Sequence, residues 1–398
     1  MKLKATPIAL LLSIAGLAAH PALAQDKVKI GFLTDMSSAY GDLDGKNGAM
    51  AIQMAIDDFG GKVNGLPVEL ISADHQNKPD VAASKAREWI DTQNLSMLVG
   101  GTHSAAALAM AKIAQDKKRV FIANGPGTSA LTNEQCSPYT IHYAYDTVAL
   151  ARGTANAMLK KDFKNWYFLA ADYAFGEALQ RDATGVIKAG GGQVIGSVKH
   201  PVNASDFSSF LLQAKNSKAQ ILGIANGGTD LINALKASKE FGIDKSMKVA
   251  ALMVFLTDIH SMGLKNAEGL LFTTSWDWTL NEESRKFGQR FFAKAKRMPT
   301  DVQAANYSAT MNYLKAVQAT QSTDADKVMA YFKTTKLKDF YGEGTVRPDG
   351  RYAHNMYLMQ VKSPAESTQP WDYVKLVATM PGDEVFTTKA ETRCALWK

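Results

Sequence analysis

Short apolar runs alternate with segments of helical spacing through the first third of the chain, and glycine or polar residues separate them. Strands that are apolar along nearly their whole length are typical of a parallel sheet covered by helices on both faces. The predicted strands are residues 28–33, 68–73, 97–99 and 120–123, and the predicted helices are residues 47–59, 79–91 and 105–117.

The same alternation starts again at Asp146, which indicates a second unit of the same kind. Its predicted strands are residues 166–170, 194–198, 221–225 and 249–255, and its predicted helices are residues 146–160, 176–188, 207–215 and 230–241. From Gly269 the pattern changes to a strand at 270–274, helices at 281–296, 301–318 and 324–332, a turn at 347–350 and a strand at 357–361. The sequence therefore predicts an α/β fold with two doubly wound parallel-sheet units.

The first 24 residues have the three parts of a secretory signal peptide. Lys2 and Lys4 give the positive start, residues 8–18 the apolar centre, and Ala22-Leu23-Ala24 the small residues of a cleavage site. The apolar centre is too short to span a membrane, and no later run reaches the roughly 18 apolar residues that a span requires. We therefore predict an exported, soluble chain from which residues 1–24 are removed.

The formal net charge is +7, to which Lys2 and Lys4 contribute two charges. The basic residues are spread along the chain, and the nearest to a cluster, residues 117–119, ends a predicted helix, where cations suit the helix dipole. Neither this distribution nor export favours a nucleic-acid partner.

Cys136 and Cys394 are the two cysteines of the chain. An even count in an oxidising compartment predicts one disulfide between them. Neither cysteine has a His or another Cys at zinc-ligand spacing, so we expect neither a metal site nor a cofactor.

The segment from Ser96 to Ala114 holds the most distinctive candidate site. A short strand ends in two glycines, then come Thr102, His103 and Ser104, and an alanine-rich helix follows. The first N–H groups of a helix lack internal partners and the helix dipole favours negative charge there, so this junction predicts an anion site. Ser104 is placed to cap the helix and to contact the anion; capping alone is the alternative.

Ligands of open α/β sheets bind at the carboxyl ends of the strands. In this chain those ends are rich in hydroxyl groups, glycines and aromatic rings, and poor in paired carboxylates and His/Cys clusters. The segments concerned are residues 35–40, 100–104, 124–129, 172–176, 226–229 and 256–258.

These positions favour a binding protein over an enzyme. His103 and Ser104 are neighbours on a turn, and no G-x-S-x-G elbow frames the serine. Asp42 and Asp44 do not continue into the spacing of a calcium loop, so they are interpreted as turn residues. No G-x-G-x-x-G follows the first strand, which argues against a dinucleotide.

The stretch GFLTDMSSAYGDLDGKNGAMAIQMAIDDFGGKVNGLPVELISAD resembles the opening of the type I periplasmic solute-binding proteins, the leucine/isoleucine/valine-binding family of ABC importers. The resemblance continues, in order, through LVGGTHSAAALA, residues 124–132, LAADYAFGEAL and AEGLLFTTSW, and it covers essentially the whole mature chain. It implies a periplasmic monomer that holds a small molecule between two doubly wound lobes and works with an ABC permease of the inner membrane.

The resemblance also implies the bounds of the lobes. Lobe 1 is expected at residues 26–145 and 276–343, lobe 2 at 146–275 and 344–361, a C-terminal tail at 362–398, and three crossovers near 143–146, 272–276 and 344–351.

The ligand contacts are carried over position by position. Ser104 stands where the family's serine holds a carboxylate, Tyr40 where an aromatic ring covers the ligand, and Phe175 where a tyrosine is common in lobe 2. The implied ligand-binding set is Tyr40, Thr102, His103, Ser104, Gly125, Gly127, Thr128, Tyr173, Phe175, Asn226, Gly227, Leu252 and Trp276.

One position departs from the family pattern. Amino-acid binders carry an acid after the fourth strand of lobe 2 to pair with the ligand's ammonium, whereas this chain has Leu252 or Met253 there. A buried, unpaired ammonium would be costly, so the sequence favours a small carboxylic acid, aromatic or other, over a branched-chain amino acid. Two alternatives stay open. One is that Asp258 or Asp230 supplies the missing charge. The other is that the chain is a periplasmic sensor that presents the same class of solute to a receptor.

Overall fold

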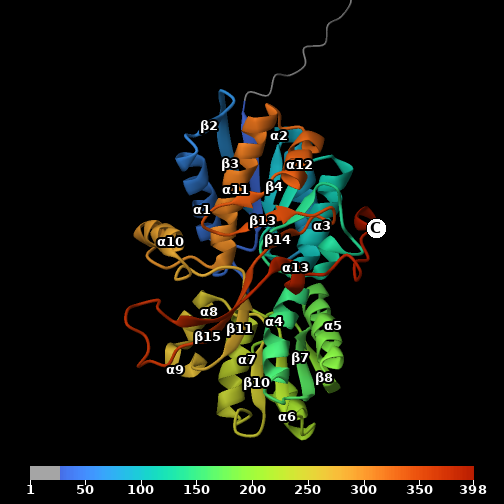
Figure 1. The fold of residues 1–398 in the computed structure, drawn as a ribbon, viewed down its shortest axis with the longest axis vertical. Coiled ribbons are helices and arrows are strands. Elements are labelled where there is room, and N and C mark those ends of the chain that lie inside the picture. The colour runs from blue at the N-terminus through green and yellow to red at the C-terminus, as the bar shows by residue number, and fades with distance from the viewer. Residues whose placement is uncertain (1–26) are drawn as a thin grey trace, which may run out of the picture.

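The computed structural model describes residues 27–398, which form two lobes that lie one above the other in Figure 1. The predicted signal peptide lies outside these residues. Helices and parallel strands alternate as the apolar runs predict, so the α/β class is confirmed. No helix of the described chain combines the length and the apolarity needed to cross a membrane.

Lobe 1 is built on a six-stranded sheet in the order β2-β3-β1-β4-β5-β6, which is parallel except for the short strand β2. Its strands are β1 (Val28–Thr34), β2 (Lys62–Val63), β3 (Leu66–Asp74), β4 (Met97–Gly100), β5 (Val120–Ala123) and β6 (Thr140–His142). Its helices are α1 (Gly45–Asp58), α2 (Pro79–Gln93), α3 (Ser104–Asp116), α10 (Glu282–Ala295), α11 (Asp301–Thr320) and α12 (Ala325–Thr334), with a 3₁₀ turn, η1, at Ser129–Thr132.

Both faces of this sheet are covered by helices, as its continuous apolar strands require. Phe32 and Val99 belong to the core that includes α1 and α11, whereas their neighbours Leu33 and Leu98 belong to the core that includes α2 and α3. Successive residues of a strand point to opposite faces, so the positions of β1 and β4 are apolar or small on both faces, apart from Lys29 and Thr34 at the two ends of β1. The sheet therefore holds the carboxyl ends of its strands at one rigid edge.

Lobe 2 has a four-stranded parallel sheet in the order β10-β9-β7-β8. Its strands are β7 (Asn165–Ala171), β8 (Gln193–His200), β9 (Ile221–Ala225) and β10 (Lys248–Ala251), and its helices are α4 (Thr147–Leu159), α5 (Ala174–Ala189), α6 (Ser208–Asn216), α7 (Thr229–Glu240), α8 (Leu256–Met262) and α9 (Leu264–Ala267).

The strand predicted at 249–255 is shorter in the structure. β10 ends at Ala251 because the chain bends at Leu252 and Met253. Phe255 is then the N-cap residue of α8, and its N–H donates to the Asp258 carboxylate at 2.9 Å.

Two small sheets lie where the chain passes between the lobes. One consists of β11 (Leu271–Thr274), β15 (Met356–Val361) and β16 (Val374–Met380), and the other of β12 (Leu337–Lys338), β13 (Glu343–Val346) and β14 (Tyr352–His354). Arg351, just before β14, bridges to His142 of β6, so this hairpin stays with lobe 1. The third passage between the lobes therefore lies between β14 and β15, later than residues 344–351.

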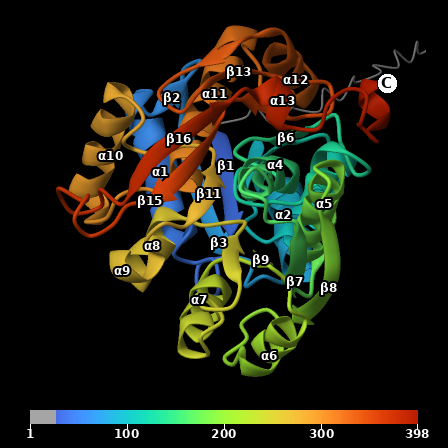
Figure 2. The same cartoon turned by 60° about the horizontal axis from the view of Figure 1, so that its bottom comes forward.

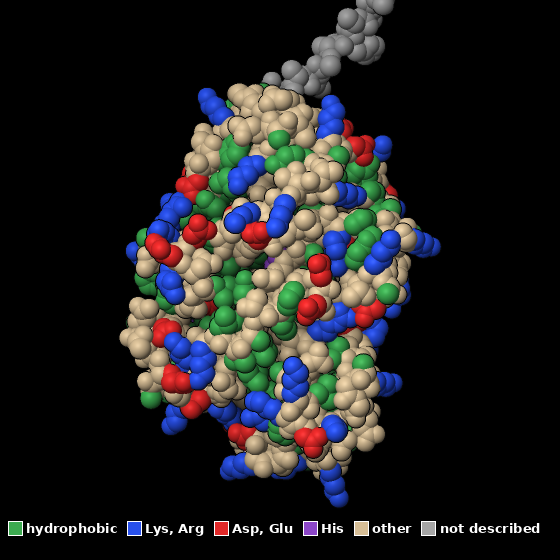
Figure 3. Space-filling model, viewed as in Figure 1, with side chains coloured by type: hydrophobic (Ala, Val, Ile, Leu, Met, Phe, Trp, Pro, Cys, Tyr) green, Lys and Arg blue, Asp and Glu red, His purple; other side chains and the backbone are tan. Residues whose placement is uncertain are grey.

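The C-terminal segment returns from lobe 2 to lobe 1. In Figure 2 it runs, in red, from β15 and β16 past α13 (Gly382–Val385) to the final 3₁₀ turn, η2 (Ala395–Trp397). Cys394 at its end is bonded to Cys136 of lobe 1, so the predicted disulfide is confirmed. On the face seen in Figure 3, basic and acidic side chains are interspersed over both lobes.

Candidate ligand-binding site

The junction between β4 and α3 forms one wall of the site in lobe 1. Gly100 and Gly101 turn the chain at φ values of 110° and 79°, which favour glycine. The prediction that Ser104 caps α3 is wrong, because the helix begins one residue earlier than expected. His103 is the N-cap residue, and its Nδ1 accepts a hydrogen bond from the Ala106 N–H at 3.3 Å. Ser104 therefore belongs to the first turn of the helix.

Ser104 is tied to the second loop of lobe 1. Its buried Oγ accepts a hydrogen bond from the Thr128 N–H at 3.3 Å, which fixes the oxygen and leaves the hydroxyl hydrogen for another acceptor. The first amides of α3 lie in the same turn, at the positive end of the helix dipole. This arrangement can hold a carboxylate.

Gly125 and Gly127 allow other groups to approach this second loop closely. A Cβ at position 125 would lie 2.6 Å from Thr102 Cγ2, and one at position 127 would lie 2.6 Å from the Phe175 ring. The Tyr145 hydroxyl donates to the Gly125 carbonyl at 2.7 Å and holds the loop in place. The absence of a side chain at Gly127 thus lets a ring of lobe 2 lie directly on the loop of lobe 1.

Tyr173 of lobe 2 joins the two lobes at the site. Its ring stacks on His103, with centroids 4.4 Å apart and planes at 10°, and its hydroxyl pairs with that of Tyr40. Phe175 lies beside it, with the two ring centroids 6.1 Å apart. Burial lowers the pKa of His103 to about 4, so its imidazole is neutral at neutral pH. The structure thus brings the four predicted rings together where the two lobes meet: Tyr40 and His103 of lobe 1, and Tyr173 and Phe175 of lobe 2.

The loop after β9 makes a further contact between the lobes. The Thr229 N–H, at the start of α7, donates to the Ala39 carbonyl of lobe 1 at 3.3 Å. Met253 lies against Gly227, where a Cβ would collide with its terminal methyl group, whereas Leu252 is fully buried. Met253 therefore touches this loop, whereas a ligand contact of Leu252 stays a prediction.

Trp276 lies between the lobes and lines a small cavity with residues 254–256 of lobe 2, whereas the side-chain hydrogen bond of Asn226 stays inside lobe 2. The Trp276 indole N–H donates to Ser284 Oγ at 3.0 Å, and the ring packs edge-on against Phe287 and Phe340, so it belongs to an aromatic cluster with residues of lobe 1. Asn226 pairs its Nδ2 with His200 Nε2 at 3.0 Å, within lobe 2.

Sequence reasoning missed a buried polar network beneath the site. Asp44 accepts hydrogen bonds from the Thr34 hydroxyl at 2.8 Å and from Asn306 Nδ2 at 2.6 Å. Thr34 also pairs with the Thr102 hydroxyl at 2.9 Å, and Asn306 accepts from Asn124 Nδ2 at 2.6 Å. Asp44, interpreted from the sequence as a turn residue, therefore supports both loops of lobe 1. Periodicity gives no signal for it, because Asn306 lies 262 positions away.

The protonation of Asp44 should make the stability of the fold depend on pH. Burial raises its pKa to about 7, although the hydrogen bonds from Thr34 and Asn306 oppose this. In the unfolded chain the carboxyl ionises at about 3.9. The folded state therefore holds the proton more tightly, so the associated stability is fully present below about pH 4 and is lost as the pH rises from about 4 to about 7.

We expect the wild-type protein to lose more free energy of unfolding between about pH 5 and about pH 8 than the variant Asp44→Asn, because most of the change falls below the folded pKa of about 7. The asparagine keeps the size of the side chain and one oxygen to accept from Asn306 Nδ2, and it does not ionise. Denaturant titrations at both pH values measure the difference. Asp42→Asn is the control, because that side chain is 74% exposed and pairs with Arg297. Equal pH dependence in wild type and Asp44→Asn would contradict the expectation.

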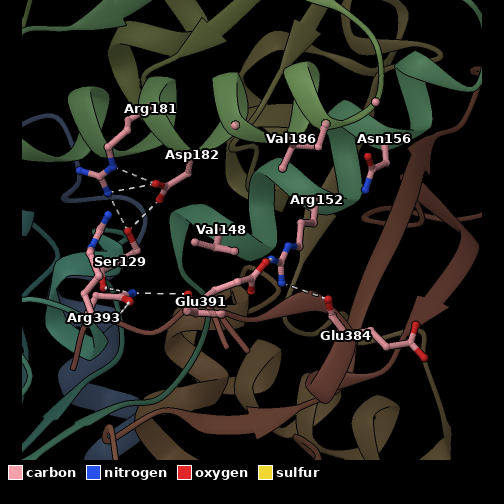
Figure 4. Close-up of a pocket in the computed structure, with 15 residues that line it drawn as sticks. Ser129, Val148, Arg152, Asn156, Arg181, Asp182, Val186, Glu384, Glu391 and Arg393 are labelled. Carbon is pink, nitrogen blue, oxygen red and sulfur yellow. Dashed lines mark hydrogen bonds and ion pairs between the residues drawn. The ribbon is translucent and has the colours of Figure 1, made fainter. Parts of the chain in front are cut away.

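A groove of about 700 Å³ lies behind the Thr128 loop, at the junction of α4, α5 and the C-terminal segment (Figure 4). Ser129 Oγ donates to the Asp182 carboxylate of α5 at 2.7 Å, which links the lobes here. The groove's three arginines, Arg152, Arg181 and Arg393, each pair with an acidic residue. The groove thus joins the lobes and the C-terminal segment rather than presenting free positive charge to an anion.

The part of the chain that the structure describes has no group of three or more His, Cys, Asp or Glu side chains arranged for a metal ion.

Known proteins are similar to this chain in fold and in sequence. The family model described as periplasmic binding protein matches residues 27–368. A periplasmic binding protein from Burkholderia mallei is 60% identical, with a TM-score of 0.93 over 94% of this chain and 100% of that one. A branched chain amino acid ABC transporter periplasmic ligand-binding protein from Burkholderia xenovorans LB400 is 41% identical, with a TM-score of 0.84 over 94% and 100%.

A more distant structure shares the fold. It is a solute binding protein of an ABC transporter from Rhodopseudomonas palustris BisB5, in complex with 3,4-dihydroxybenzoic acid. It is 24% identical, with a TM-score of 0.81 over 90% of this chain and 98% of that one.

Proposed function

This chain belongs to the periplasmic binding protein family, whose members are substrate-binding proteins of ABC transporters rather than enzymes, and we propose that it clamps a small carboxylate-bearing solute between its lobes and delivers it to a permease. The observation that carries the proposal is the position of Ser104. Its hydroxyl lies in the first turn of α3, is fixed by the Thr128 N–H, and stands next to the His103 ring that Tyr173 of lobe 2 covers.

The solute class follows from the walls of the site. Tyr40, Tyr173 and Phe175 suit a flat or branched apolar body, whereas a sugar would need many more polar partners. Met253 is not an acid, and the Asp258 carboxylate already binds the N–H at the start of its own helix. We therefore favour an aromatic or other small organic acid over a branched-chain amino acid. Among the neighbours, the Burkholderia xenovorans protein is named for branched chain amino acids and the Rhodopseudomonas protein holds a dihydroxybenzoic acid.

Binding proceeds in two stages in this proposal. The carboxylate first meets the hydroxyl and amides of lobe 1, which are rigidly held by the sheet and by the network around Asp44. The rings of lobe 2 then close over the solute. Closure depends on a higher affinity of the solute for the closed state than for the open state.

Replacing Ser104 with alanine is expected to weaken carboxylate binding by about 1.5–3 kcal/mol, roughly tenfold to a hundredfold, because a hydrogen bond to a charged group is lost. Titration calorimetry on the mature chain with benzoate and with 4-methylpentanoate measures the change. Ser209→Ala is the matched control, since that serine is exposed on α6, and it should bind like wild type. Unchanged affinity in Ser104→Ala would remove Ser104 from the site.

A further inference from the structure

The C-terminal segment crosses from lobe 2 after β16 and is then fixed to lobe 1. A Cβ at Gly382 would lie 2.7 Å from a carbonyl oxygen of β14, so the segment runs directly against the lobe 1 hairpin. Phe386 is fully buried, with its ring 4.4 Å from the Arg351 guanidinium. The disulfide of Cys394 fixes the far end to lobe 1. Residues 382–394, which we call the C-terminal strap, therefore move with lobe 1.

One side chain of lobe 2 binds this strap. Arg152, in α4, donates through Nη1 to the Phe386 carbonyl at 2.6 Å and to the Glu384 carbonyl at 3.2 Å. Its Nη2 also pairs with the Glu391 carboxylate at 2.6 Å (Figure 4). All three acceptors belong to the strap, so these bonds join lobe 2 to lobe 1.

A second link between the lobes lies in the same groove. The Asp182 carboxylate of α5 accepts from the Ser129 hydroxyl of lobe 1 at 2.7 Å and from the Thr147 hydroxyl at 2.6 Å. The Arg181 guanidinium donates to the same Ser129 oxygen at 2.9 Å. Side chains of both α4 and α5 thus bind groups that are fixed on lobe 1.

These links are made in an arrangement in which the lobes also meet at the solute site, where the Tyr173 ring of lobe 2 stacks on His103 of lobe 1. Rotation of the lobes away from each other has to break the bonds of Arg152, because its acceptors move with lobe 1. The bonds therefore stabilise the closed state relative to an open one. The apparent affinity for a solute rises with the population of the state that binds it best.

We propose that Arg152 and the C-terminal strap form a latch that favours the closed arrangement of the lobes and sets the affinity for the solute from outside its site. The inference deepens the proposed function, on which its effect on affinity rests. Arg152 is then a positioning residue, which acts on the solute only through the lobes. Its loss should therefore weaken the binding of different solutes by the same factor.

The first test needs no solute. Small-angle X-ray scattering is recorded on the mature chain, refolded from denaturant to remove any bound molecule, for wild type and for Arg152→Met. The variant should have the larger radius of gyration, because a larger fraction of its molecules is open. Arg393→Met is the matched control: Arg393 lines the same groove, but its partner Glu134 lies on the same side of it, in lobe 1. It should scatter like wild type.

The second test is titration calorimetry with benzoate and with 4-methylpentanoate. Arg152→Met should weaken the binding of both acids by the same factor, roughly three- to tenfold. Arg393→Met should leave both affinities unchanged. Glu391→Gln removes the charge of a partner that is 49% exposed, so it tests the latch without altering α4. It should open the lobes and weaken binding in the same direction as Arg152→Met, by a smaller amount.

Each outcome decides the inference. Scattering of Arg152→Met and Glu391→Gln that matches wild type would overturn the latch whether or not either acid binds. Tighter binding, a loss confined to one acid, or an equal loss in Arg393→Met would overturn it as well. If neither acid binds wild type, the proposed function fails, and the scattering comparison still decides whether the latch holds the lobes together.

Discussion

Replacing Arg351 with methionine is expected to lower the free energy of unfolding by about 3–5 kcal/mol, because it leaves a buried carboxylate without its cation. Arg351 and Asp146 are both buried, with Nη1 and Oδ2 3.3 Å apart. Arg351 also donates to the His142 carbonyl, and its guanidinium lies 4.4 Å from the centre of the Phe386 ring. Asp146 in turn accepts from the Ala149 N–H at 2.8 Å and so caps α4. One ion pair thus joins the first passage between the lobes to the β13–β14 hairpin.

Urea unfolding of the variants measures this effect. The double variant Arg351→Met with Asp146→Asn should recover much of the loss, since it removes the unpaired charge as well as its partner. Arg290→Met is the matched control, because its pair with Asp58 is partly exposed and should be worth about 1 kcal/mol or less. If Arg351→Met unfolds at the same urea concentration as wild type, the ion pair does not stabilise the contact between the first passage and the β13–β14 hairpin.

Removing the disulfide by Cys136→Ser with Cys394→Ser should cost about 2–5 kcal/mol of stability. The bonded cysteines are 258 positions apart, so the bond greatly restricts the unfolded chain. Other contacts also hold the C-terminal segment: Arg152 donates to the Phe386 carbonyl at 2.6 Å, and Arg393 pairs with Glu134 at 2.9 Å. We therefore expect the folded structure to persist with lower stability.

Denaturant unfolding under non-reducing conditions gives the measurement. Wild type treated with a thiol reductant should match the double serine variant, which separates the loss of the bond from the effect of the new hydroxyl groups. Coincident transitions for oxidised wild type and the variant would show that the bond adds nothing to stability.

The layered fold could be predicted from the sequence because parallel strands covered on both faces are continuous apolar runs. The strand β16 could not, since Leu376 and Val377 are both about half exposed and give no alternation of apolar and polar positions. Its pairing with β15, which lies earlier in the chain, decides its conformation. The short strand β14 is likewise set by its long-range neighbours, as the bridge between His142 and Arg351 shows.

The site could be predicted in part, because some of its residues lie next to strands and helices that the local sequence encodes. Ser104 begins α3 and Gly127 lies in the loop after β5, and the strands and helices beside them are locally encoded, so the sequence could predict where they stand in the fold. The capping by His103 depends on where α3 begins, and helix ends are poorly defined by propensity alone. The pairing of Tyr40 with Tyr173 joins residues 133 positions apart, so no local pattern encodes it.

The bond between Cys136 and Cys394 gives the polypeptide a closed covalent circuit that contains all four passages between the lobes, including the return of the C-terminal segment to lobe 1. A protease that cuts once anywhere inside this circuit therefore breaks the chain without dividing the molecule. Both fragments stay linked and migrate as one species on a gel until a reductant separates them. For a protein working outside the cytoplasm among proteases, a single nick releases neither lobe.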